Sequence, residues 1–199
     1  MTRTRTHTNP LNIKHRFDSI KFTDIVPNDA KTISLEIGFG RGVFLKHWAT
    51  HNPNDFLLGV EVRKVIVTDV MSQVKQLSLG NVALFHGSGH IFIEDVIPDN
   101  SLDHVFVFHP DPWFKKRHHK RRVINLDFVK LIEAKLKKQG KLYISTDVEL
   151  LWSDMCEVMK QFSLTEIADD IFWKDIYKTH WDLFSKSDKR SIFFQAYQK

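Results

Sequence analysis

The sequence predicts an α/β fold in which a mostly parallel sheet carries helices on both faces. From residue 32 onward, short β-rich runs alternate with segments whose apolar residues recur at helical spacing, and such alternation is typical of parallel sheets. The run Val-Phe-Val-Phe at 105–108 is continuously apolar, as in a central strand buried on both faces. A length of 199 residues and a hydrophobic content of 42% fit one domain with a buried core.

The individual elements follow from this alternation. We expect strands at residues 32–37, 56–60, 82–85, 102–108, 142–145 and 191–197. Helices are expected at 62–79, 126–138 and 150–162. Asn125 is a candidate N-cap for the second of these helices, and Lys137, Lys138 and Gly140 are candidates for its C-terminal end.

Several classes of protein are excluded by composition. The only cysteine, Cys156, rules out an internal disulfide framework and a multi-cysteine metal site. His118 and His119 are adjacent and would point about 100° apart on a helix, so no metal is expected. The N-terminus has no apolar core of a secretory signal, and no run approaches the ~18 apolar residues of a membrane helix. These features predict a soluble cytoplasmic protein without a membrane partner.

The positive charge of the chain is concentrated in one segment. Residues 115–122 read Lys-Lys-Arg-His-His-Lys-Arg-Arg, and without these six cations the formal net charge of +5 falls to −1. A local basic patch attracts polyanions, nucleic acid first among them, although a solvated surface run is the alternative. Residues 1–30 are also polar and basic, and we expect a loosely held arm there that adds Arg3, Arg5, Lys14 and Arg16 to an RNA surface. Residues 31–199 would then form a single domain.

A glycine-rich loop follows the first predicted strand. It reads Glu36-Ile-Gly38-Phe-Gly40-Arg-Gly42, and glycines let the backbone turn tightly and approach a ligand closely. Glu61 ends the second predicted strand about twenty residues later, where an acid typically accepts hydrogen bonds from ribose hydroxyls. The pattern predicts a nucleoside-cofactor site, the alternative being a glycine-rich turn beside two unrelated glutamates.

The side chains of Val43 and Glu36 limit which cofactor could bind there. The dinucleotide fingerprint requires Gly or Ala at the position of Val43, and the chain contains no P-loop motif. A carboxylate at Glu36 would repel a pyrophosphate, whereas it suits a ligand with an ammonium and a sulfonium group. S-adenosylmethionine is such a ligand.

The fourth predicted strand leads into a rigid acidic segment. Asp111 stands between Pro110 and Pro112, which restrict the backbone on both sides, and Trp113 follows. Rigidity of this kind helps to position a catalytic group. The alternative is a structural Asp-Pro turn capped by a buried Trp. Because the basic segment 115–122 follows directly, we favour a catalytic role for Asp111.

Together these motifs resemble those of a known family. The chain looks like the bacterial tRNA (guanine-N7-)-methyltransferases of the TrmB type, most specifically in its Pro-Asp-Pro-Trp segment with the basic run behind it. The similarity covers residues 31–160 well and the last forty residues weakly. The motifs that carry it are residues 36–42, 59–61, 110–113, 115–122 and 145–147.

The resemblance implies a fold, an activity and a set of roles. The fold would be the Rossmann-like class I methyltransferase fold, with a mostly parallel seven-stranded sheet. The activity would be S-adenosylmethionine-dependent methylation of guanine N7 in tRNA, at position 46 of the variable loop. Cofactor binding would fall to Glu36, Gly38, Gly40, Gly42, Glu61, Ser88 and Asp111. Asp111 would also be catalytic. Substrate binding would fall to Lys115, Asp147, Thr179 and Asp182, and phosphate binding to Lys116, Arg117, Lys120, Arg121 and Arg122.

Three positions depart from the family pattern. Ser88 stands where the family usually has an acid near the adenine, and a hydroxyl can still form hydrogen bonds there. His109 precedes Pro110 in place of an aromatic or small residue. Asp182 ends the C-terminal Thr-x-x-acid motif and is one methylene shorter than the usual Glu.

Other readings of the sequence remain open. A methyltransferase of the same fold could act on another RNA or on protein. A non-enzymatic basic RNA-binding module would also carry the basic run, but it would not need Glu36, Glu61 and Asp111. A nicotinamide-dependent oxidoreductase is disfavoured by Val43 and by the cations. The sequence does not distinguish a monomer from a homodimer.

Overall fold

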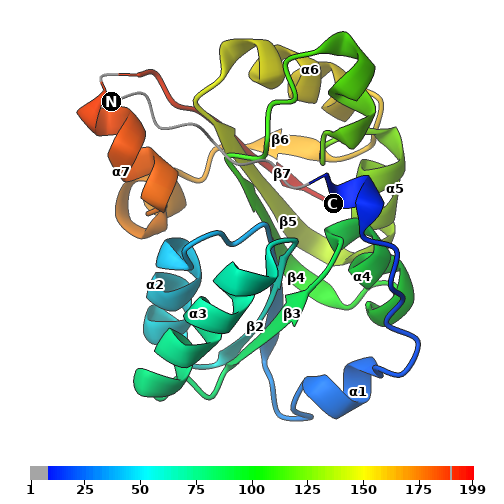
Figure 1. Cartoon of the computed structure of the whole chain (residues 1–199), viewed down its shortest axis with the longest axis vertical. Helices are drawn as coiled ribbons and strands as arrows, with labels where there is room; N and C mark the ends of the chain where they lie inside the picture. The colour runs from blue at the N-terminus through cyan, green and yellow to red at the C-terminus, as the bar shows by residue number, and fades with distance from the viewer. Residues whose placement is uncertain (1–8, 189) are drawn as a thin grey trace.

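One twisted sheet of seven strands runs through the protein (Figure 1). The computed structural model describes residues 9–188 and 190–199. The strand order is β3-β2-β1-β4-β5-β7-β6, with β1 to β5 parallel and β7 antiparallel to both β5 and β6. The strands are β1 (Thr32–Ile37), β2 (Asp55–Glu61), β3 (Val82–His86), β4 (Leu102–Phe108), β5 (Leu136–Thr146), β6 (Thr165–Ile167) and β7 (Phe193–Gln198). The predicted mostly parallel sheet is therefore confirmed.

Helices cover both faces of this sheet, as Figure 1 shows. On one face, α2 and α3 pack in a core that includes Phe44 and Val70; on the other, α4, α5 and α6 pack around Phe92 and Phe128. A π-helical turn at Phe172–Ile176 leads toward α7 and packs against the α2 face. The helices are α1 (Phe22–Ile25), α2 (Val43–His51), α3 (Lys64–Gln76), α4 (Gly89–Val96), α5 (Leu126–Lys135), α6 (Glu149–Met159) and α7 (His180–Ser187).

The junction between α5 and β5 differs from the prediction. Asn125 caps α5 as expected, since its side chain accepts a hydrogen bond from the amide of Phe128 at 3.0 Å. The helix ends at Lys135, however, and residues 137–140 already belong to β5. Lys137 binds Asp103 at 2.7 Å across the sheet. The predicted helix end at 137–140 was wrong, because strand pairing outweighed the local helical signal.

Residues 9–30 are bound to the domain rather than loosely held. The Phe17 side chain is buried in the core, and its backbone amide donates to Asp95 on α4 at 2.9 Å. Arg16 forms an ion pair with Glu94 at 2.9 Å. A side chain at Gly87 would meet the Phe17 ring at 2.5 Å, so the two surfaces fit closely. Arg3 and Arg5 lie outside the described residues, and the division of the chain at residue 30 stays a prediction.

Within the described ranges, no helix is both long and apolar enough to cross a membrane. The same part of the chain holds no group of three or more His, Cys, Asp or Glu side chains placed to bind a metal ion.

Candidate active site at the carboxyl edge of the sheet

A cavity of about 670 Å³ opens where the parallel strands end. This size is in the range of sites for small ligands and cofactors, and its position beyond the carboxyl ends of the strands is where open α/β sheets bind ligands. The sequence-predicted residues Glu36, Gly38, Gly40, Glu61, Ser88, Asp111, Lys120, Arg121, Arg122 and Thr179 all line it. Motifs as far apart in the chain as Glu36 and Thr179 therefore meet at one place.

The glycine loop between β1 and α2 uses a backbone that only glycine adopts without strain. Gly38, Gly40 and Gly42 have φ angles of +76°, +51° and +63°. Gly42 does not line the cavity; it stands at the N-cap of α2, where an added Cβ would lie 2.6 Å from a methyl group of Val70. Gly42 thus lets α2 pack closely on α3. This packing holds in place the loop whose Gly38 and Gly40 line the cavity.

We expect Gly42→Ala to lower the free energy of unfolding by about 2–4 kcal/mol, because it combines a left-handed backbone with overpacking. Urea denaturation measures this. Gly80→Ala is the matched control, since a Cβ there meets nothing within 4 Å and its φ is not left-handed, and it should change stability by less than about 0.5 kcal/mol. Equal stability of the two variants would refute the packing role of Gly42.

Glu36 places a carboxyl group in the cavity wall near the end of β1. The residue is 4% exposed, and its Oε2 has no hydrogen-bond partner among the described residues. Burial, and secondly the nearby charge of Glu61, raise the pKa of Glu36 to about 8. A buried polar atom without a partner is uncommon, and here it marks a position where a cationic ligand group would be stabilised.

Glu61 ends β2 and is also buried. Its Oε2 accepts from the amide of Gly40 at 3.1 Å, which ties the acid to the glycine loop. Arg63 donates to the same carboxylate from its backbone amide at 3.0 Å and from its guanidinium at 3.0 and 2.9 Å. Sequence analysis missed Arg63. Its place two residues after Glu61 was the available signal, because a short turn after a strand lets an Arg fold back on an acid.

Asp111 lies between two strained residues. His109 and Trp113 have φ angles of +46° and +44°, which are uncommon for residues other than glycine. Such strain gathers at functional sites, where the surrounding structure must hold it in place. Asp111 itself is partly exposed and lines the cavity. Its charge adds to that of Glu61 in raising the pKa of Arg63, for which the Glu61 hydrogen bond is the main cause.

The basic segment forms a short 3-10 helix at Lys116–Arg121 beside the cavity. Four of its side chains are exposed and can reach phosphates; they are Lys115, Lys116, Arg117 and Lys120. Arg121 lies 5.0 Å over the ring of Trp113, an arrangement that lets a cation and an aromatic face attract each other.

Arg122 differs from the rest of the basic segment. Its side chain is 5% exposed, donates to the backbone oxygen of Pro112 at 2.8 Å and forms an ion pair with Asp154 on α6. The phosphate-binding role predicted for Arg122 does not fit this structure, because its guanidinium holds the Pro110–Pro112 segment against α6 instead. Sequence position alone did not separate it from its exposed neighbours.

The C-terminal Thr-x-x-Asp motif begins α7. The Thr179 hydroxyl oxygen accepts from the amide of Asp182 at 2.8 Å, the first half of a capping box. Thr179 lines the cavity together with His180 and Trp181, whereas Asp182 is 2% exposed. Thr179 thus reaches the cavity, and its contact with substrate stays a prediction. Asp182 is turned inward, so its predicted contact with substrate does not fit this structure.

Asp147 follows β5 and is likewise turned inward. Its side chain is fully buried, beside His109 and with hydrogen bonds at 2.9 Å from Ser185 and Arg190. The RNA contact predicted for Asp147 therefore does not fit this structure either. Ser88, in contrast, stands at the N-cap position of α4 and lines the cavity as predicted.

Comparisons with known proteins fit this geometry. A family model described as "Putative methyltransferase" matches residues 30–195. The tRNA (guanine-N(7)-)-methyltransferase of Shewanella amazonensis is 40% identical over 141 residues, which are 71% of this chain and 59% of that protein. The enzyme of the same name from Serratia proteamaculans is 37% identical over 153 residues, which are 77% and 64% of the two chains. The chain thus spans less than two thirds of the length of these relatives.

A solved structure shows the same fold. The SAM-dependent methyltransferase from Aquifex aeolicus superposes with a TM-score of 0.58 and 14% sequence identity, over 84% of this chain and 81% of that one. The predicted Rossmann-like class I methyltransferase fold is confirmed. With more than four fifths of its length matched by the family model, the chain belongs to this family of methyltransferases.

Proposed function

We propose that this protein transfers a methyl group from S-adenosylmethionine to N7 of a guanine in tRNA and acts in the cytoplasm. The observation that carries the proposal is one cavity that unites Glu36, Glu61 and Asp111 and has exposed cations at its rim. The names of the relatives in Shewanella and Serratia support tRNA as substrate and N7 as target. Position 46 of the variable loop follows from the resemblance of the motifs.

The residues of the cavity fit S-adenosylmethionine. The Oε2 of Glu36 offers an acceptor for an ammonium group, and Gly38 and Gly40 let a ligand approach the backbone. Glu61 would accept hydrogen bonds from the ribose hydroxyls, and these bonds would replace the ones that it now accepts from the Arg63 guanidinium. The Arg63 side chain is 37% exposed and can turn outward. Ser88 would bind on the adenine side. When bound, this cofactor supplies an electrophilic methyl group.

Asp111 would then stabilise the product of methyl transfer. Guanine N7 carries a lone pair and no proton, so attack on a methyl group requires no general base. The chain's task is to orient the base and to favour the positive charge that develops on the ring. A carboxylate at Asp111 can accept hydrogen bonds from the guanine edge and offset that charge, and Thr179 and Trp181 line the same cavity.

The first experiment is transfer of a labelled methyl group from S-adenosylmethionine to bulk tRNA. Borohydride reduction and aniline cleavage then locate any 7-methylguanosine. Cleavage in the variable loop would support cofactor, substrate and target atom together. Cofactor binding without labelling of tRNA would point to another RNA or to protein as substrate, and absence of both would refute the proposal.

The exposed cations should set the salt dependence of tRNA binding. Each phosphate neutralised contributes up to ~0.9 to the slope of log affinity against log salt. Replacing both Lys115 and Lys116 by alanine should therefore flatten that slope by up to ~1.8. Fluorescence anisotropy with tRNA between 50 and 300 mM salt (roughly the range in which this term dominates) gives the slope.

A matched pair of lysines provides the control. Lys75 and Lys138 are as exposed as the tested pair, but they stand at the end of α3 and the start of β5, at the opposite edge of the sheet. Their replacement by alanine should leave the slope within ~0.3 of the wild type, since distant charges are screened. If both double variants flattened it equally, only the overall charge would matter and the basic segment would not be the RNA surface.

A further inference from the structure

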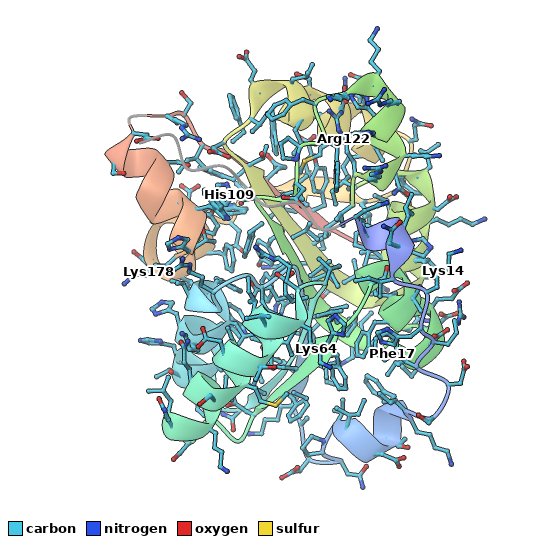
Figure 2. All side chains as sticks on the ribbon, in the orientation of Figure 1. Lys14, Phe17, Lys64, His109, Arg122 and Lys178 are labelled. Atoms are coloured by element: carbon cyan, nitrogen blue, oxygen red, sulfur yellow. The ribbon has the colours of Figure 1, made fainter. Side chains whose placement is uncertain are left out.

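Directly behind the Asp111 segment lies a cluster of buried polar side chains. His109 and Asp147 both have fully buried side chains, and His109 Nδ1 stands 3.4 Å from Asp147 Oδ1. On the other side of the ring, His109 Nε2 lies 2.9 Å from the hydroxyl of Tyr177, which in turn lies 2.8 Å from the hydroxyl of Ser145. Figure 2 shows His109 in the interior of the molecule, on the side toward α7.

The hydrogen bonds of this cluster are mutually consistent. An imidazole with its proton on Nδ1 donates to Asp147 and accepts from Tyr177, and Tyr177 accepts from Ser145. Every polar atom of the imidazole thus has a partner, which buried polar groups require. Because each bond is made in an environment that excludes water, loss of one partner leaves the others unpaired.

Three segments of the chain meet at this cluster. His109 directly follows β4 and precedes the Pro110–Pro112 turn. Asp147 follows β5, and it also accepts hydrogen bonds at 2.9 Å from Ser185 in α7 and from Arg190 beyond it. Tyr177 lies two residues before Thr179, which lines the cavity.

The backbone at His109 needs such support. Its φ of +46° is unfavourable, although His tolerates this region better than most residues. Its amide donates to the Ser145 oxygen at 2.8 Å, which extends the β4–β5 pairing by one residue. Strained backbone persists where the surroundings hold it, and here the surroundings are Tyr177, Asp147 and Ser145.

We propose that His109 is a positioning residue that couples the Asp111 segment to residues 177–187. Through Tyr177 and Asp147, it sets the catalytic carboxylate and the cavity wall at Thr179 and Trp181 in one arrangement. The expected effect on kcat rests on the proposed function. The structural coupling does not, because it follows from the contacts of His109. It also gives Asp147 a role inside the protein in place of the RNA contact.

Kinetics of Tyr177→Phe and His109→Phe test the coupling. Tyr177→Phe removes one hydroxyl and no packing volume. Each variant should lower kcat for tRNA methylation by about 10- to 100-fold, because misplacement of a catalytic group by about 1 Å has such effects. The KM for S-adenosylmethionine should stay within about twofold, because Tyr177 does not line the cavity and His109, which does, has a fully buried side chain. The double variant should be little worse than either single one, and His109→Gln, which keeps a group near Tyr177, should recover part of the loss.

Two other polar residues of the sheet serve as controls. His104 lies on the same strand β4 and bonds Ser34 at 3.1 Å, and Tyr143 on β5 donates to Asp169 at 2.7 Å; neither lines the cavity. His104→Phe and Tyr143→Phe can lower stability, yet they should leave kcat within about twofold. If they reduced kcat as much as the tested variants, or if the losses at His109 and Tyr177 simply multiplied, the proposal would be overturned.

Hydrogen–deuterium exchange supplies a readout that does not depend on activity. Amides in 177–187 should exchange about tenfold faster or more in His109→Phe, and at the wild-type rate in His104→Phe. If the wild-type protein did not methylate tRNA, the proposed function would be refuted. The exchange rates would still test whether His109 couples the two segments. Unchanged exchange in His109→Phe would overturn the coupling itself.

Discussion

Replacing Asp111 by asparagine is expected to lower the turnover number for methyl transfer to tRNA by about 100- to 1000-fold. Asparagine keeps the shape of the side chain and removes its charge. The loss should therefore fall on the step in which positive charge develops on the guanine, while the affinity for S-adenosylmethionine changes by less than about threefold. Single-turnover kinetics and calorimetric titration measure the two quantities separately.

The control for Asp111 is another carboxylate of the same cavity. Asp127 also lines it, but it is exposed in the first turn of α5. Asp127→Asn should retain turnover within about threefold of the wild type, since an exposed charge acts through screening solvent. If Asp111→Asn also kept its turnover number within about threefold of the wild type, Asp111 would be a structural turn residue. Other groups would then stabilise the positive charge of the product.

Cofactor binding should depend on pH through Glu36. Burial raises the pKa of Glu36 to about 8, so its carboxyl group is largely protonated at neutral pH. A cationic ligand group needs the ionised form. The affinity for S-adenosylmethionine should therefore rise by up to tenfold per pH unit below pH 8 and level off above it. Titration calorimetry at pH 7, in buffers of different ionisation enthalpy, should detect release of about one proton on binding.

Replacing Glu36 by glutamine should remove that pH dependence and weaken binding about 100-fold, because a neutral amide does not pair with a cation. The stability of the protein without cofactor should change with pH in the opposite direction to its cofactor affinity. Since the pKa of Glu36 in the folded protein lies above its ordinary value of 4.5, ionisation of Glu36 makes the wild type lose stability as pH rises from about 4.5 to about 8. Glu36→Gln should lack this loss and melt higher than the wild type at pH 8.

An exposed glutamate separates these effects from a general change in charge. Glu166 lies on the edge strand β6, away from the cavity. Glu166→Gln should bind and melt like the wild type at every pH. If wild-type affinity were flat between pH 6 and pH 8, the idea that Glu36 ionises on binding would be wrong.

Much of the fold was readable from local pattern. The strands at 32–37 and 102–108 were predicted with their observed bounds, because the first alternates polar and apolar residues, the second ends in a continuous apolar run, and glycine or proline follows within two residues of each. The boundary at Lys135 was not predictable in this way. Residues 137–140 favour a helix end by composition. They lie in strand because Leu136 and Lys141 on either side pair with β4, Gln139 and Gly140 bond Lys199, and Lys137 forms an ion pair with Asp103.

The candidate site was predictable where its chemistry is local. Glu36 and Glu61 lie at the ends of strands, and the glycines and Asp111 follow strand ends. Parallel strands end at one edge, so the convergence of these residues followed from topology. The direction of a side chain is not local. Arg122 and Lys120 look alike in sequence, yet one is held inside by Asp154 and the other is exposed. Asp147 is turned inward by Arg190, a partner 43 positions away.

The placement of β7 between β5 and β6 has a consequence for synthesis on the ribosome. Among the described residues, strand β6 is paired in the sheet only through β7, which begins 26 positions after β6 ends and covers the open edge of β5. Until β7 has been made and has left the ribosome, β1 to β5 can assemble, but the edge of β5 stays open. Before that point, the unpaired backbone groups of β5 could pair with strands of other chains. Chaperones would therefore be needed until β7 pairs with β5.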